Sequence, residues 1–123
     1  MQLSHISLTE EVQFFIKSYA DGAYAVKKAG FDGVEVHALH EGYLMDQFSM
    51  ECTNRRTDQY GGSIENRLRF ATETVQAIKE KCGKYFPVLI RYSVKSYMKG
   101  FGTDKGALLG EEFKEFGRDL EES

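Results

Sequence analysis

The chain has 123 residues, of which 41% are hydrophobic and 28% are charged, and its formal net charge is −3. This length and apolar content suit one packed domain of ordinary size. The slight acidic excess argues against nucleic acid as a partner, because a phosphate backbone is bound by a basic surface.

The first ten residues (MQLSHISLTE) lack the basic stretch and apolar core of an export signal. No apolar run along the chain is long enough to cross a bilayer, so we expect no membrane segment. Cys52 and Cys82 fit neither a metal knuckle nor a disulfide framework, which favours free thiols in a reducing compartment. The sequence therefore predicts a cytoplasmic protein.

A long helix is predicted over residues 8–29. Ser7 and Glu10 have the spacing of a capping box. The apolar residues that follow fall on one helical stripe, which consists of Val12, Phe15, Ile16, Tyr19, Ala23 and Val26. Gly30 stands where a left-handed cap would end the helix.

A short buried strand is predicted over residues 33–37, ending at His37. The polar stretch 38–62 then reads as a long loop with one helical turn in its apolar island, and loops of this length are usually functional or disordered. Ser63 is expected to cap a second helix, ended by Gly83, with an inner face made of Leu68, Ala71, Val75 and Ile78.

A second buried strand is predicted over residues 86–92, with the only proline, Pro87, at its start. A glycine-bearing loop, 100–110, leads to a third helix beginning near Glu111. This alternation of helices and strands is typical of a parallel α/β fold. Two parallel strands cannot bury themselves, so the sequence predicts part of a larger sheet.

Polar side chains gather where the two predicted strands end, which is where ligands bind in α/β folds. His37 and His40 can both donate hydrogen bonds to one developing oxyanion. Tyr43 carries a phenol that can deliver a proton, and Arg91 presents a permanently charged fork of donors. Residue types and spacing thus indicate a site for carbonyl chemistry.

The same residues allow other interpretations. The two histidines could form a satisfied structural pair, or they could bind a metal together with Glu35 and Glu41. Glu35 could be a structural ion-pair partner, for which Arg91 is the natural candidate. Cys82, near a helix end, is most simply a packed small hydrophobe.

Two runs closely resemble the signatures of the Old Yellow Enzyme family of flavin oxidoreductases, and the resemblance covers essentially the whole chain. The first run is residues 54–70 (NRRTDQYGGSIENRLRF), and the second is residues 29–40 (AGFDGVEVHALH) followed by 42–44 (GYL). The residues around Glu41 are similar to the branch that contains clostridial 2-enoate reductases and bile-acid-inducible dienoyl reductases.

This resemblance implies a (β/α)₈ TIM barrel that binds FMN, takes electrons from NADH or NADPH and reduces the activated alkene of an α,β-unsaturated carbonyl compound. Residues 1–123 would form a single partial domain, from about strand 4 to the start of helix 5, with two core parallel strands. Some larger relatives carry an iron–sulfur cluster, but this chain lacks the cysteines for one. We expect the isolated chain to bind FMN weakly and to be inactive. The alternative is a non-catalytic half-barrel that self-associates.

The resemblance also implies roles for individual residues. His37 and His40 would bind the substrate carbonyl oxygen, Tyr43 would protonate the α-carbon, and Arg91 would contact the flavin ring. Residues 56–58 and 60–63 would serve as scaffold, with Gly61 and Gly62 allowing positive φ.

Overall fold

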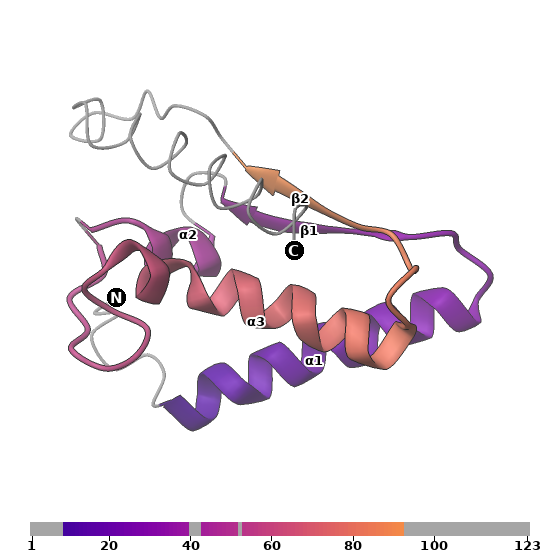
Figure 1. Ribbon diagram of the computed structural model, residues 1–123, viewed down its shortest axis with the longest axis horizontal. Coiled ribbons are helices and arrows are strands. Elements are labelled where there is room, and N and C mark those ends of the chain that lie inside the picture. Colours follow the sequence, from indigo (N-terminus) through magenta and orange to yellow (C-terminus); the bar gives the residue numbers. More distant parts are fainter. Residues whose placement is uncertain (1–8, 40–42, 52, 93–123) are drawn as a thin grey trace. The chain divides into compact units, whose positions relative to one another are not determined.

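The computed structural model of the chain describes residues 9–39, 43–51 and 53–92. The elements in chain order are α1 (Thr9–Lys28), β1 (Val34–Leu39), α2 (Leu44–Ser49), α3 (Ile64–Cys82) and β2 (Val88–Tyr92) (Figure 1). The two strands are hydrogen-bonded neighbours and run in the same direction, so the predicted parallel α/β arrangement is confirmed for this part of the chain. Ser7 and the helix predicted near Glu111 lie outside the described residues.

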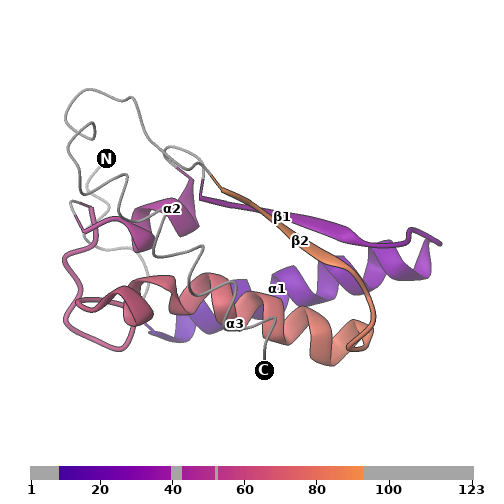
Figure 2. The ribbon, with the colours of Figure 1, turned by 45° about the horizontal axis from the view of Figure 1, so that its top comes forward.

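The chain divides into two compact units. Unit 1 contains Met1–Val36 and Phe70–Leu89, and unit 2 contains His37–Arg69 and Ile90–Ser123. Within unit 1, α1 and the second part of α3 cover one face of the strand pair (Figure 2). Unit 2 holds the ends of both strands, α2, the loop after α2 and the first turns of α3.

The buried stripe of α1 is narrower than the sequence predicts. Val12, Ile16, Ala20 and Ala23 are buried, whereas Phe15 is 36% exposed and packs edge-on against the ring of Phe14. Phe15 belongs to the predicted apolar stripe but not to the buried face of the helix. Two of the four buried residues are alanines, so α1 packs against its neighbours through a narrow face. The ring of Phe15 lies outside this face.

Glycine ends α1 as the sequence predicts. Gly30 has a φ of +95°, and its N–H donates to the carbonyl of Lys27 at 3.0 Å. The N–H of Phe31 donates to the carbonyl of Val26 at 3.4 Å, which completes a Schellman motif. Gly83 ends α3 in the same left-handed region, with a φ of +100°.

Ser63 caps α3, because its Oγ accepts a hydrogen bond from the N–H of Asn66 at 3.3 Å. The helix buries a wider face than predicted. Val75 is only half-buried, while Phe70 and Thr74 are buried, and the Thr74 hydroxyl donates to the carbonyl of Phe70 at 2.8 Å. Cys82 is a buried free thiol, as expected.

Both strands differ from the prediction at their ends. β1 continues two residues beyond His37, and β2 begins only after Pro87. Val36 and Ala38 are buried but Glu35 is exposed, and Leu89 of β2 is 56% exposed. Only alternate strand residues are shielded, as expected for two parallel strands that form part of a larger sheet.

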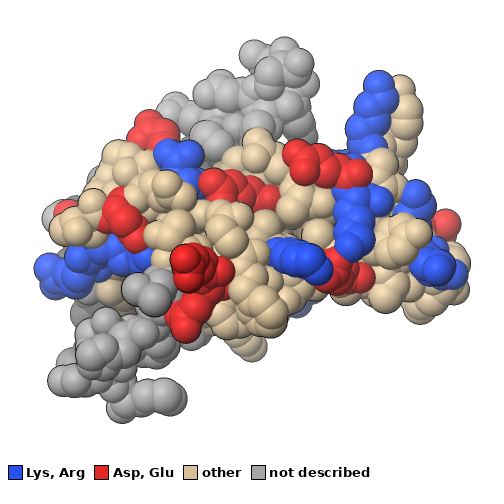
Figure 3. Space-filling model, turned by 90° about the horizontal axis from the view of Figure 1, so that it is seen from below, with Lys and Arg blue, Asp and Glu red and all other residues tan. Residues whose placement is uncertain are grey.

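Charged residues of both signs mix on the face shown in Figure 3. In unit 1, Asp21 of α1 accepts hydrogen bonds from Lys17, at 2.6 Å, and from Lys81 of α3. These two lysines hold the pKa of the Asp21 carboxyl below its ordinary value of 3.8. No helix among the described residues is both long enough and apolar enough to span a membrane.

The Asp21 ion pairs make a pH-dependent contribution to stability. Because the pKa of Asp21 is lowered by folding, the stabilisation is full above the unfolded-state pKa and is lost as the pH falls through the folded-state value. We expect Asp21→Asn to be less stable than the native chain at neutral pH, and this deficit to disappear as the pH falls below the ordinary Asp value of 3.8 and through the lowered pKa of the folded state. Urea unfolding across this range measures the difference. A deficit that is independent of pH would contradict the assignment.

Candidate active site

The hydrogen bond between the Val34 N–H and the Pro87 carbonyl, at 3.0 Å, sets the register of the two strands. In a parallel pair this bond places Val34 opposite Val88, and so His37 opposite Arg91 three residues further on. Neighbouring strands lie about 4.8 Å apart. Both residues alternate with the shielded positions of their strands, so they project from the same face of the sheet.

His37 and Tyr43 pack against each other in unit 2. Their ring centroids are 4.5 Å apart with a tilt of 39° between the planes. The imidazole is partly shielded, with Nε2 buried, while the Tyr43 side chain is 53% exposed. Tyr43 occupies the N-cap position of α2, where its side chain makes no capping hydrogen bond. The phenol is thus directed to the histidine and to solvent instead of to the helix backbone.

The structure brings three of the four predicted site residues together. His37 and Arg91 are lateral neighbours by register, and Tyr43 contacts His37. His40 and Glu41 lie outside the described residues, so the second histidine stays a prediction and the alternative of a metal site with Glu41 is not tested. Among the described residues, no group of three or more His, Cys, Asp or Glu side chains could hold a metal.

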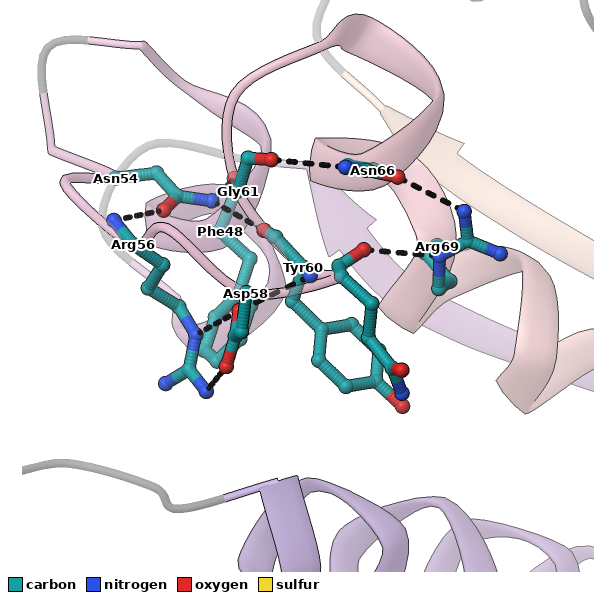
Figure 4. Close-up of polar contacts among 9 residues, drawn as sticks. Phe48, Asn54, Arg56, Asp58, Tyr60, Gly61, Asn66 and Arg69 are labelled. Atoms are coloured by element: carbon teal, nitrogen blue, oxygen red, sulfur yellow. Dashed lines mark hydrogen bonds and ion pairs between the residues drawn. The ribbon is translucent and has the colours of Figure 1, made fainter.

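Asn54 organises the loop between α2 and α3 (Figure 4). Its Nδ2 donates to the carbonyl of Phe48 at 2.5 Å and to that of Tyr60 at 2.7 Å. Its Oδ1 accepts the backbone N–H of Arg56 at 3.0 Å. One amide side chain therefore ties three points of the backbone, a role that sequence reasoning missed although Asn54 opens the signature run.

Arg56 and Asp58 form an ion pair within the same loop. The guanidinium of Arg56 lies 5.3 Å from the ring centroid of Phe48, and Phe48 packs edge-on against Tyr60. Asp58 also accepts the backbone N–H of Tyr60 at 3.1 Å. Charge, ring packing and backbone hydrogen bonds thus hold the loop in one conformation, which supports its reading as scaffold.

The first turn of α3 holds the other side of the loop. Asn66 donates to the carbonyl of Gly61 at 3.0 Å, and Arg69 donates to the carbonyl of Gln59 at 2.9 Å. Arg69 also donates to the side-chain oxygen of Asn66 at 2.8 Å. The polar residues of the run 54–70 therefore contact mainly one another and the loop backbone.

The two adjacent glycines serve different purposes. Gly62 has a φ of +91°, as predicted. Gly61 does not adopt a positive φ, so the conformational freedom expected of it is not used. It is buried, and a Cβ at this position would overlap the carbonyl oxygen of Arg56. Gly61 is required for the close approach of two backbone segments.

Gly61→Ala is expected to destabilise the fold by about 3 kcal/mol or more, because backbone must move to admit the methyl group. Gly22→Ala is the matched control. Gly22 lies exposed within α1 with nothing within 4 Å of the added Cβ, so this change should stabilise the fold by about 0.5–1 kcal/mol. Urea unfolding of both variants measures the difference, and equal stabilities would contradict the packing at Gly61.

The imidazole, phenol and guanidinium groups lie near the strand ends of a parallel α/β chain, which is where ligands bind in folds of this class. The family is defined by comparison. Residues 2–117 match the model of the NADH:flavin oxidoreductase / NADH oxidase family, so the chain belongs to that family. The resemblance to Old Yellow Enzyme-type flavin oxidoreductases is confirmed.

Two of the relatives are similar to nearly the whole of this chain. It is 59% identical to cinnamate reductase of Clostridium sporogenes over 114 residues, which cover 93% of this chain and 17% of the relative. It is 41% identical to NADH oxidase of Thermoanaerobacter brockii over 113 residues, which cover 92% of this chain and 16% of that protein. The chain therefore spans a small part of the length of these relatives.

Solved structures confirm the likeness in three dimensions. The structure of 6-hydroxypseudooxynicotine amine oxidase from Pseudomonas geniculata matches 86% of this chain and 16% of its own, with a TM-score of 0.77 and 34% identity. Morphinone reductase in complex with tetrahydroNAD matches 78% of this chain and 25% of its own, with a TM-score of 0.66 and 46% identity.

Proposed function

We propose that this chain forms about the fourth strand to the start of the fifth helix of a (β/α)₈ barrel that binds FMN and reduces α,β-unsaturated carbonyl compounds. The family match and the adjacent parallel strands support this proposal. A barrel supplies the further strands and the enclosed face that this strand pair needs. The single observation that carries the function is the contact of Tyr43 with His37, beside which Arg91 lies on the neighbouring strand.

His37 and His40 bind the carbonyl oxygen of the substrate. Hydrogen bonds from imidazole to this oxygen stabilise the negative charge that develops there when the β-carbon is reduced. Tyr43 then donates its phenolic proton to the α-carbon, a role that requires an accessible hydroxyl. The exposure of Tyr43 and its ring contact with His37 suit proton transfer to a ligand that is bound by the histidine.

Arg91 binds the flavin. Arg91 is exposed on the strand next to His37, and its guanidinium presents a planar fork of donors. Planar, charged donors of this kind suit the oxygen- and nitrogen-rich edge of a flavin ring. When bound, FMN would supply hydride chemistry for reduction of the alkene, with NADH or NADPH as its reductant.

The substrate class follows from the relatives. The 59% identity to a cinnamate reductase extends over 93% of this chain, and all three proposed site residues that the structure describes lie within the family match. We therefore propose a 2-enoate, with cinnamate as the first compound to test.

A chimera tests the proposal. The matching segment of the Clostridium sporogenes cinnamate reductase is replaced by residues of this chain, and FMN content and cinnamate reduction are measured. The expected result is a yellow protein that reduces cinnamate. A chimera that folds and binds FMN but does not reduce cinnamate would contradict the proposed substrate, and one that folds without FMN would contradict the proposed cofactor site.

A further inference from the structure

The short helix α2 carries the candidate proton donor at its start. α2 has six residues, and isolated helices of this length are not stable in water. Tyr43 directly precedes it, and the Tyr43 carbonyl accepts the N–H of Gln47 at 3.0 Å. The backbone of Tyr43 is thus part of the first turn of α2. Whatever fixes α2 also fixes the phenol.

The last four carbonyls of α2 all have hydrogen-bond donors. The backbone carbonyl of Asp46 accepts a hydrogen bond from the N–H of Met50 at 3.1 Å, and that of Gln47 accepts one from the hydroxyl of Thr53 at 2.7 Å. The carbonyls of the last two residues, Phe48 and Ser49, are bound by side chains from further along the chain. These terminal carbonyls are the groups that a helix cannot satisfy itself.

The two distant donors are Asn54 and Arg67. Asn54 donates to Phe48 at 2.5 Å and is itself held by Tyr60 and Arg56. Arg67, on the first turns of α3, donates through Nη1 to the carbonyl of Ser49 at 3.1 Å. Its positive charge also suits the negative end of the α2 dipole. One end of α2 is therefore anchored both to the loop and to α3.

We propose that Asn54 and Arg67 are positioning residues, which hold the C-terminal end of α2 and thereby keep the Tyr43 phenol against His37. The effect of this positioning on catalysis rests on the proposed role of Tyr43 as the acid. The signature run thus contributes to the site without touching substrate: two of its residues set the place of the proton donor at the opposite end of a short helix.

Ring-current shifts in proton NMR of the 123-residue chain test this inference without flavin or substrate. The imidazole protons of His37 are assigned by comparison with His37→Gln. The Tyr43 ring changes their chemical shift, and the spectrum of Tyr43→Leu shows how large this change is. Arg67→Met and Asn54→Asp should lose most of it. Arg67→Lys, which keeps a charged donor, should recover part of it.

Arg69→Met is the matched control. Arg69 lies on the same turns of α3, but its hydrogen bonds go to Gln59 and Asn66 and not to α2, so this variant should keep the shift. Circular dichroism checks that every variant keeps its helices. The inference is overturned if folded Arg67→Met and Asn54→Asp retain the full shift, if Arg69→Met loses it equally, or if the native chain shows no Tyr43-dependent shift. Inactivity of the cinnamate reductase chimera would leave these outcomes unchanged and would count against the proposed function alone.

Discussion

Tyr43→Phe in the cinnamate reductase chimera is expected to lower kcat for cinnamate reduction by about 10²- to 10⁴-fold, the range for loss of a positioned general acid. The change removes only the hydroxyl. The ring that packs 4.5 Å from His37 remains, so binding of substrate and FMN should change little. Steady-state kinetics at saturating cinnamate, with the FMN content measured beforehand, gives the effect.

Tyr85→Phe is the control for this variant, because Tyr85 is 85% exposed and lies outside the proposed site. Its kcat should equal that of the unmodified chimera. If Tyr43→Phe also keeps full activity, solvent or another residue supplies the proton and Tyr43 is not the acid.

His37→Ala should lower kcat by about 10²- to 10³-fold, the usual cost of removing one donor to a developing oxyanion. His37→Asn keeps a side-chain donor near the same position and should recover part of the loss. The alanine variant also removes the ring against which Tyr43 packs. The same kinetic assay compares the three proteins.

A double variant tests whether His37 and Tyr43 act in one step. Side chains that stabilise the same transition state give non-additive losses, so His37→Ala with Tyr43→Phe should cost less than the product of the two single effects. Strictly multiplicative losses would mean that the two residues act independently.

Much of the fold could be predicted because the helix signals are local. Ser63, Gly30 and Gly83 act on the backbone of their own turns, so α1 and α3 end within one or two residues of their predicted bounds. What each helix buries depends on its neighbours. For this reason the apolar stripe of α1 could not show that Phe15 is exposed, and the buried Phe70 of α3 was missed.

Part of the site could also be predicted from the sequence. Strand order and register place His37 beside Arg91, and both follow from the parallel arrangement. The end of β1 could not be located, because strand length depends on pairing with β2. The carbonyl contacts of Asn54 and Arg67, and the close approach at Gly61, arise only when distant backbone segments meet. No local pattern encodes them.

The proposed function assigns His37 to the substrate and Arg91 to the flavin, with both residues on one face of the sheet and within a single site. The dissociation constant of FMN from the chimera, measured by flavin fluorescence, tests this division directly. Arg91→Met should weaken FMN binding by about 10- to 100-fold, as expected for loss of a charged hydrogen bond. His37→Ala should leave FMN affinity unchanged while lowering kcat. Unchanged FMN binding in Arg91→Met, or an equal loss in both variants, would contradict the proposed site.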